Sequence, residues 1–206
     1  MASGGLATIG VVSLKAADKR QKMLAAIPFF FAIQQAVEGF QWISLNAGKP
    51  SMTLAYTFLF FAFLFWPTYM PLTIFKLEPK RKKLLGFLLM CGVVISCFLL
   101  WALLSEPLSV YVRGSSICYD INFPFGLAIS TLYVVVTCGV LLFSSNKFMN
   151  WVGLLVLLSA IISEIFFYYV FISVWCFFAA IISSLVYLYI KYPKIYASSL
   201  DKYNLA

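Results

Sequence analysis

Apolar segments of about 20 residues recur along the chain and alternate with short polar stretches. The hydrocarbon core of a bilayer requires helices of that length, because it is about 30 Å thick and each helical residue adds about 1.5 Å. The composition agrees, since 63% of the 206 residues are hydrophobic and only 11% are charged. These features are typical of a polytopic membrane protein and exclude an ordinary soluble domain.

We predict an all-α fold in which residues 1–206 form a single transmembrane domain, a bundle of seven helices. The predicted spans are residues 1–14, 23–45, 52–75, 84–104, 124–143, 148–168 and 171–192. The first would be about 21 Å long and too short to cross alone, so we expect the natural helix to be longer. Spans one to three and five to seven are candidate halves of an internal repeat, joined by the fourth span as a linker helix.

The distribution of positive charge predicts the orientation. All but two of the 15 lysines and arginines follow the first, third, fifth or seventh span, and the exceptions are Lys49 and Arg113. Because cytoplasmic loops are enriched in Lys and Arg, we expect the N-terminus outside and the C-terminus in the cytoplasm. The same rule predicts a turn near 168–173, which returns Lys147 and Lys191 to one side. The net charge of +8 therefore needs no nucleic acid as a partner.

Span two carries the polar residues that point most directly to function. Gln34, Glu38 and Gln41 are spaced i, i+4 and i+7, which places them on one helix face with Gln35 beside them. An ionisable group at membrane depth costs at least about 2.5–3.5 kcal/mol, so it usually faces a cavity or a partner. The alternative is a protonated structural glutamate that hydrogen-bonds to Gln34 or to a neighbouring helix.

Two further groups are candidates for the same site. Glu164 lies at a depth similar to that of Glu38 in the predicted topology, and Tyr168 follows it by one helical turn. Pro67 and Pro71 remove backbone donors from span three, so this segment contains either a plain kink or a hinge with free carbonyl groups.

The residue types that are missing exclude several kinds of chemistry. The chain has no histidine, which excludes a Ser-His-Asp triad and removes the usual ligands of catalytic zinc and of haem. No Cys-x-x-Cys pair is present, and we predict neither a metal nor a cofactor. Cys118 and Cys176 both fall near the predicted outer side, where a disulfide between them is geometrically conceivable.

Residues 27–42 read Ile-Pro-Phe-Phe-Phe-Ala-Ile-Gln-Gln-Ala-Val-Glu-Gly-Phe-Gln-Trp. This segment resembles the Ile-Pro-x5-Gln-Gln-x-x-Glu-Gly-x-x-Trp segment of an uncharacterised family of small bacterial polytopic membrane proteins. Members of that family typically open with Met-Cys-Phe-Ser-Ala, so the resemblance implies a chain shortened at its N-terminus. It implies a bacterial inner-membrane location and no particular activity.

The arrangement of three, one and three spans also resembles PQ-loop and SWEET-type transporters. This analogy concerns architecture alone, because their Pro-Gln signature is missing and the prolines do not fall in matching helices.

We expect a transporter of a small molecule or cation, with proton coupling as one form of the hypothesis. Glu38 would be the titrating or cation-binding group, the three glutamines the polar lining, and Glu164 a second site. One alternative is a membrane-embedded enzyme that acts on a lipid or isoprenoid, with the glutamates as acid and base. Another is a non-catalytic receptor or accessory subunit. Short loops argue against an enzyme, and the oligomeric state stays open.

Overall fold

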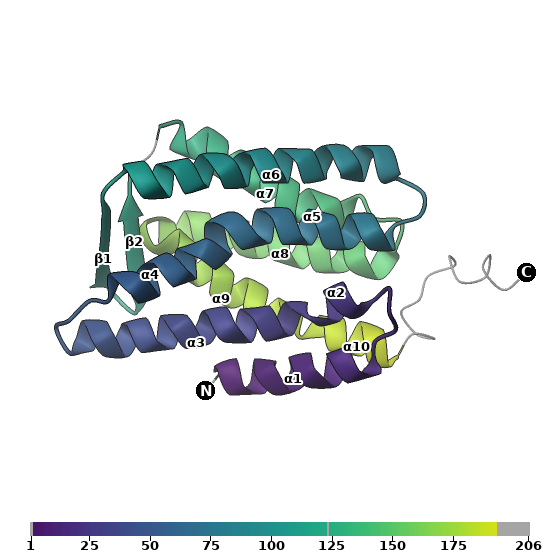
Figure 1. Cartoon of the computed structure of the whole chain (residues 1–206), viewed down its shortest axis with the longest axis horizontal. Helices are drawn as coiled ribbons and strands as arrows, with labels where there is room; N and C mark the ends of the chain where they lie inside the picture. The colour runs from purple at the N-terminus through teal and green to yellow at the C-terminus, as the bar shows by residue number, and fades with distance from the viewer. Residues whose placement is uncertain (1, 123, 193–206) are drawn as a thin grey trace, which may run out of the picture.

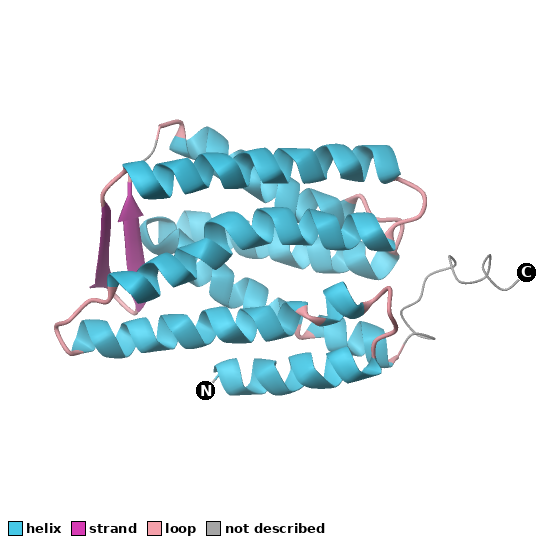
Figure 2. Ribbon diagram, viewed as in Figure 1, coloured by secondary structure: helices cyan, strands magenta, loops and turns pink. Residues whose placement is uncertain are grey.

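The structure is a computed structural model that describes residues 2–122 and 124–192. The fold is mostly helical, with long helices packed side by side and one small sheet at one end (Figures 1 and 2). The helices are α1 (Ala2–Ala16), α2 (Lys22–Ala25), α3 (Ile27–Asn46), α4 (Met52–Leu59), α5 (Trp66–Leu77), α6 (Lys82–Ser105), α7 (Gly126–Leu142), α8 (Lys147–Phe167), α9 (Phe171–Ser183) and α10 (Leu185–Lys191). A π-helical turn (Phe60–Phe65) joins α4 to α5, and a 3-10 turn (Tyr168–Val170) joins α8 to α9.

Side chains cap the first turns of α4 and α8. The hydroxyl of Ser51 accepts a hydrogen bond from the backbone N–H of Leu54 at the start of α4. The side-chain oxygen of Asn146 accepts one from the N–H of Phe148 at the start of α8. Each cap pairs one of the backbone donors that a helix leaves free at its first turn.

Four segments are long and apolar enough to cross a membrane: Lys22–Asn46, Met52–Leu77, Lys82–Ser105 and Lys147–Lys191. Helix α7 is apolar but shorter, at 17 residues. The last segment, of 45 residues, is divided by the 3-10 turn at Tyr168–Val170, and α9 packs back along α8. As a result the hydroxyl of Tyr189 on α10 accepts a hydrogen bond from the amide of Asn146, which immediately precedes α8. The chain therefore reverses close to where the charge pattern predicts a turn.

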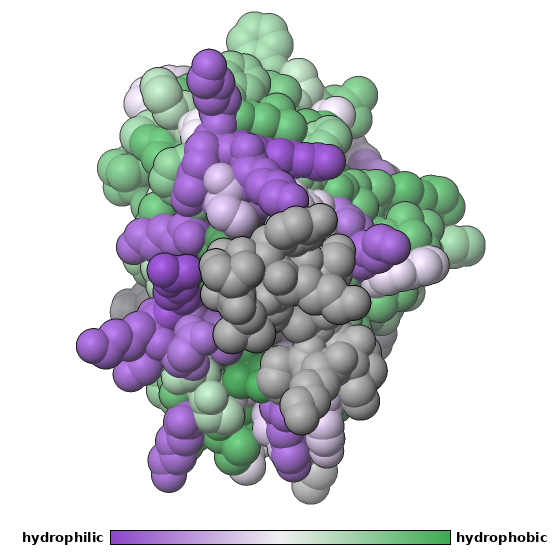
Figure 3. Space-filling model, turned by 90° about the vertical axis from the view of Figure 1, so that its right-hand side faces the viewer, coloured by the Kyte–Doolittle hydropathy of each residue, from purple (hydrophilic) through white to green (hydrophobic). Residues whose placement is uncertain are grey.

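One end of the molecule is strongly hydrophilic. The loops that follow α1, α5 and α7 all lie at this end, at the right of Figure 1, and α10 also ends there. Seen from that side in Figure 3, hydrophilic side chains gather over the face. These loops and the helix ends beside them hold most of the lysines and arginines of the chain. Lys194 and Lys202, which the orientation prediction also used, lie outside the described residues.

A two-stranded antiparallel sheet lies between the fourth and fifth predicted spans. Strands β1 (Leu108–Arg113) and β2 (Ser116–Ile121) pair from Leu108↔Ile121 to Arg113↔Ser116. Gly114 opens the two-residue turn between them with φ at +63°, a conformation that glycine adopts without strain. The expectation of an all-α fold was wrong for this segment, because short-range β pairing there outcompetes an irregular loop.

The π-helical turn in the third predicted span bends the chain between α4 and α5, as Figure 1 shows. Two of its carbonyl groups have side-chain partners from other helices. The hydroxyl of Tyr133 on α7 donates to the carbonyl of Ala62 at 2.5 Å, and that of Ser96 on α6 donates to the carbonyl of Leu64 at 3.1 Å. The irregular backbone is therefore satisfied inside the bundle, as a low-dielectric environment requires.

Candidate functional site

Helix α3 buries one polar face and exposes an apolar one. Gln34, Glu38 and Gln41 are all buried, as the i, i+4, i+7 spacing predicts, whereas Phe40 and Ile43 are exposed. Exposed apolar side chains suit a helix that faces lipid, and the buried amides and carboxylate then face protein. The polar face of α3 is thus directed into the bundle.

Gln34 is held from two sides. Its side-chain oxygen accepts a hydrogen bond from the indole N–H of Trp66 on α5, at 2.7 Å. Its amide nitrogen donates to the sulfur of Cys176 on α9, at 3.3 Å. This amide therefore ties three helices together at one point and is locked in a single orientation.

The carboxylate of Glu38 lies one turn further along α3 and is only 6% exposed. One of its oxygens, Oε2, accepts a hydrogen bond from the amide of Gln35 at 3.3 Å. The other, Oε1, has no hydrogen-bond partner among the described residues, although Ser173 of α9 lies beside the carboxyl group. A buried carboxylate oxygen without a donor is costly, so this atom calls for a partner.

Two neighbouring side chains also have buried polar atoms that lack a partner in the described part of the chain. Both side-chain atoms of Gln41 and the hydroxyl of Tyr119 are buried without a hydrogen-bond partner among the described residues. Tyr119 comes from strand β2, and its ring stacks on Phe58 of α4 with centroids 4.7 Å apart. We call Glu38, Gln41 and Tyr119 the polar cluster.

Electrostatics link Tyr119 to Glu38. Burial raises the pKa of Tyr119 well above its ordinary value, and the nearby carboxylate of Glu38 adds to this shift. The phenol is therefore protonated at neutral pH and can donate as well as accept a hydrogen bond. The polar cluster thus combines a carboxylate acceptor with an amide and a hydroxyl that can do both.

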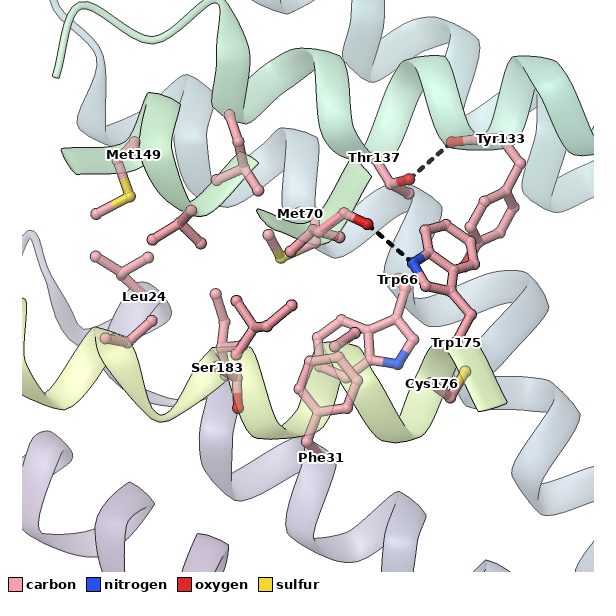
Figure 4. A pocket seen from close by; sticks show the side chains of 17 residues that line it. Leu24, Phe31, Trp66, Met70, Tyr133, Thr137, Met149, Trp175, Cys176 and Ser183 are labelled. Carbon is pink, nitrogen blue, oxygen red and sulfur yellow. Dashed lines mark hydrogen bonds between the residues drawn. The ribbon is translucent and has the colours of Figure 1, made fainter. Parts of the chain in front are cut away.

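A small apolar cavity of about 70 Å³ lies in the bundle interior, and Trp66 and Cys176, the two partners of Gln34, line it. Figure 4 shows Phe31, Trp66, Trp175 and Cys176 around it, contributed by α3, α5 and α9. The rings of Phe31 and Trp66 stack with centroids 3.9 Å apart. The lining is mostly apolar, so this cavity suits the hydrocarbon part of a ligand and not a charge.

Glu164 and Tyr168 lie elsewhere. Both are exposed and line a larger cavity, of about 440 Å³, at the end of the molecule that carries the sheet. The structure therefore keeps Glu164 outside the buried environment of Glu38. Strand β2, which carries Tyr119, forms one wall of this larger cavity. We call this space the outer cavity.

The prolines of the third predicted span and the two cysteines considered for a disulfide do not contribute to the polar cluster. Pro67 lies in the first turn of α5 and Pro71 inside that helix, directly after the π-helical turn. Pro71 has no N–H, so it leaves the carbonyl of Pro67 without its helical donor. Cys118 and Cys176 are free thiols and have different partners: Cys118 donates to the carbonyl of Tyr169, and Cys176 accepts from Gln34. The conceivable disulfide is absent here.

Trp66, Tyr119 and Arg113 are site residues that sequence reasoning did not assign to a site. Tyr119 and Arg113 belong to the hairpin, whose signal is the alternation of apolar and polar residues around Gly114. Nothing in the local sequence of Trp66 marks Gln34 as its partner. In the described part of the chain no group of three His, Cys, Asp or Glu residues could hold a metal ion.

Four long apolar segments around a buried polar cluster define an integral membrane protein of the helical-bundle class. More particularly, the chain belongs to the family of unknown function DUF6629, which matches residues 1–199. No curated protein and no solved structure matches the chain.

Proposed function

We propose that this protein is a seven-span transporter of a small molecule or cation and that Glu38 is its ligand-binding group. The observation that carries the proposal is the polar cluster. Four buried polar atoms, on Glu38, Gln41 and Tyr119, lack a hydrogen-bond partner among the described residues. Native proteins rarely leave buried polar atoms unpaired, and a cluster of them is typical of a place where something else binds.

The chemistry of the cluster favours a ligand with a positive charge or several N–H or O–H donors. A desolvated carboxylate gains most from such a partner, while the Gln41 amide and the Tyr119 hydroxyl can complete its hydrogen bonds. Glu38 can also exchange a bound cation for a proton, which is how an intramembrane carboxylate couples transport to a proton gradient.

The position of the cluster supports transport over a purely structural role. Tyr119 belongs to strand β2, which forms one wall of the outer cavity. Gln34, one helical turn before Glu38, binds Trp66 and Cys176, which line the small apolar cavity. The π-helical turn of the neighbouring span ends directly before Trp66, which holds Gln34. Such turns often occur at functional sites, and this one gives the segment a natural place to change conformation.

The proposal is tested with purified protein in liposomes and two substitutions of Glu38. A panel of amines and inorganic cations is screened first, by thermal stabilisation of the wild-type protein and then by uptake. Glu38→Gln keeps the size and the contact with Gln35 but removes the charge, so we expect normal folding and loss of uptake. Glu106→Gln, at a half-buried position outside the cluster, serves as the matched control and should transport like the wild type.

Two results would overturn the proposal. The first is uptake by Glu38→Gln at the wild-type rate, because the ionisable group would then be dispensable. The second is recovery of the ligand in a chemically altered form by mass spectrometry, which would favour the enzyme alternative. Loss of folding in Glu38→Gln together with normal folding of Glu106→Gln would show that the glutamate is structural.

A further inference from the structure

The outer cavity brings together charged side chains of both signs. It lies between the β-hairpin, the start of α7 and the turn that joins α8 to α9. Its charged lining residues are Arg113, Asp120 and Glu164, which come from β1, β2 and α8. With a volume of about 440 Å³ it is large enough for a small organic molecule.

Arg113 is held in place without being neutralised. Its guanidinium group lies over the ring of Tyr169, 3.4 Å from the centroid. In residues 2–122 and 124–192 it forms neither a hydrogen bond nor an ion pair. A guanidinium group presents a rigid fork of N–H donors that matches carboxylate and phosphate oxygens. It is therefore oriented and free to bind an anionic group.

The carboxylates on the other walls of the outer cavity can bind a cationic group. Neither Glu164 nor Asp120 uses its side chain in a hydrogen bond or ion pair within the described part of the chain. These carboxylates belong to no metal-binding group of three there, which makes an organic cation a better match than a metal ion. The ring of Tyr168 beside Glu164 adds a surface on which an ammonium group can bind.

Tyr119 relates the outer cavity to the polar cluster. It belongs to strand β2, which forms one wall of the outer cavity, but its side chain lies on the opposite face of the hairpin from Arg113 and Asp120. Its hydroxyl is buried and has no hydrogen-bond partner among the described residues, and the same side chain interacts with the carboxylate of Glu38. The outer cavity and the polar cluster therefore lie on the two faces of the same hairpin.

We propose that the outer cavity binds a zwitterionic small molecule, with Arg113 holding its anionic group and Glu164 its cationic group. This inference rests on the proposed transport function and narrows its substrate class. The outer cavity receives the ligand first, and Glu38, on the other side of the hairpin, receives its cationic end afterwards. Arg113 and Glu164 are both exposed to this cavity, so a ligand with a single charge would pair with only one of them, whereas a zwitterion pairs with both.

The test uses the purified protein in detergent and small probes that differ in their charges and in the distance between those charges. The zwitterions are glycine, 4-aminobutyrate and 6-aminohexanoate, which separate their charges by increasing distances. Butylamine and butyrate carry one charge each. Isothermal titration calorimetry should detect binding of at least one zwitterion, and both single-charge analogues should bind at least about tenfold more weakly.

Substitutions then assign the two charges. Arg113→Gln and Glu164→Gln should each weaken binding of that zwitterion by at least about tenfold. Lys49→Gln and Glu106→Gln alter a cation and an anion that lie outside the cavity lining, so they should change binding less than twofold. Absence of binding for all three zwitterions, or equal affinity of the outer-cavity variants and the wild type, would overturn the inference.

Glu38→Gln separates this inference from the proposed function. If it abolishes uptake while the outer-cavity variants bind and transport normally, Glu38 is the transport group and the outer cavity is not a binding site. If instead it transports normally while Arg113→Gln and Glu164→Gln lose binding, the outer cavity is a binding site and the role proposed for Glu38 is wrong.

Discussion

The indole N–H of Trp66 donates a hydrogen bond of 2.7 Å to the side-chain oxygen of Gln34, and both side chains are buried. This bond joins α5 to α3 at the point where the π-helical turn ends. Next to it, the ring of Trp66 stacks on Phe31 at an interplanar angle of 19°. The two contacts fix the rotation of α5 relative to the polar face of α3.

Trp66→Phe removes this donor and keeps an aromatic ring against Phe31. The oxygen of Gln34 then loses its partner, so we expect a loss of about 0.6–1.7 kcal/mol, from the average to the maximum measured for hydrogen bonds between membrane helices. Thermal unfolding in detergent measures the effect. Trp151→Phe is the control, because Trp151 is 66% exposed, and it should change stability by less than about 0.5 kcal/mol. Equal stability of both variants would show that this bond contributes little.

Gly92 on α6 is a second point of close contact. A Cβ atom there would lie 2.0 Å from the carbonyl oxygen of Pro67, the same carbonyl that Pro71 deprives of its helical donor. We expect Gly92→Ala to cost about 1–3 kcal/mol through overpacking. Gly39→Ala on α3 meets nothing within 4 Å and should be neutral or stabilising by up to about 1 kcal/mol. Stabilisation by both changes would contradict the close approach of α5 and α6.

Glu78 holds two loops together at the hydrophilic end. Its Oε2 accepts hydrogen bonds from the backbone N–H of Ser145 at 2.6 Å and from the hydroxyl of Ser144 at 3.1 Å. Its Oε1 accepts one from the N–H of Lys80 at 3.2 Å. Burial alone would raise the pKa of Glu78, but these hydrogen bonds outweigh it and lower the pKa below 4.5. The ionised form is therefore the one that stabilises the folded state.

The sign of the pH effect follows from this lowered pKa. The stabilisation by Glu78 is complete above 4.5 and is lost as the pH falls through the lower pKa of the folded state. We expect Glu78→Gln to be about 1–2 kcal/mol less stable than the wild type at pH 7, because hydrogen bonds to a charged group are the stronger ones. The gap should shrink progressively below pH 4.5. A gap that is the same at pH 7 and at pH 3 would mean that the charge is not responsible.

Cysteine labelling tests the proposed seven-span topology. In a variant whose native cysteines are replaced by serine, Lys49→Cys and Ser115→Cys should react with an impermeant reagent from outside intact cells. Lys83→Cys and Lys147→Cys should react only after permeabilisation. All four positions are exposed, so burial does not explain a failure to react. Labelling of Ser115→Cys and Lys147→Cys from the same side would contradict seven spans.

The local periodicity of the sequence was enough to place the polar face of α3, since helical spacing alone puts Gln34, Glu38 and Gln41 on one side. Charge counting located the reversal between α8 and α9. The contribution of Tyr119 could not be foreseen in the same way. It reaches the polar cluster through packing against Phe58, which lies far away in sequence, and such a contact leaves no periodic signal.

Glu164 illustrates the limit of reasoning from depth along a helix. Similar depth predicts similar distance from the membrane surface but does not predict which side of the helix faces the bundle. Ser163, its neighbour, is fully buried, whereas Glu164 is exposed to the outer cavity. Each residue adds about 100° around an α-helix, so adjacent side chains point in different directions and one can be buried while the next is exposed.

The extra residue of the π-helical turn has a consequence that a deletion can test. A π-helix holds one residue more than an α-helix would need to cover the same backbone path. Deleting one residue from Phe60–Phe65 would let the segment close into a continuous α-helix over the same path, so Trp66 would still face Gln34. The carbonyls of Ala62 and Leu64 would then take back their helical donors, and the hydroxyls of Tyr133 and Ser96 would lose their acceptors. The extra residue therefore fastens this span to α7 and α6.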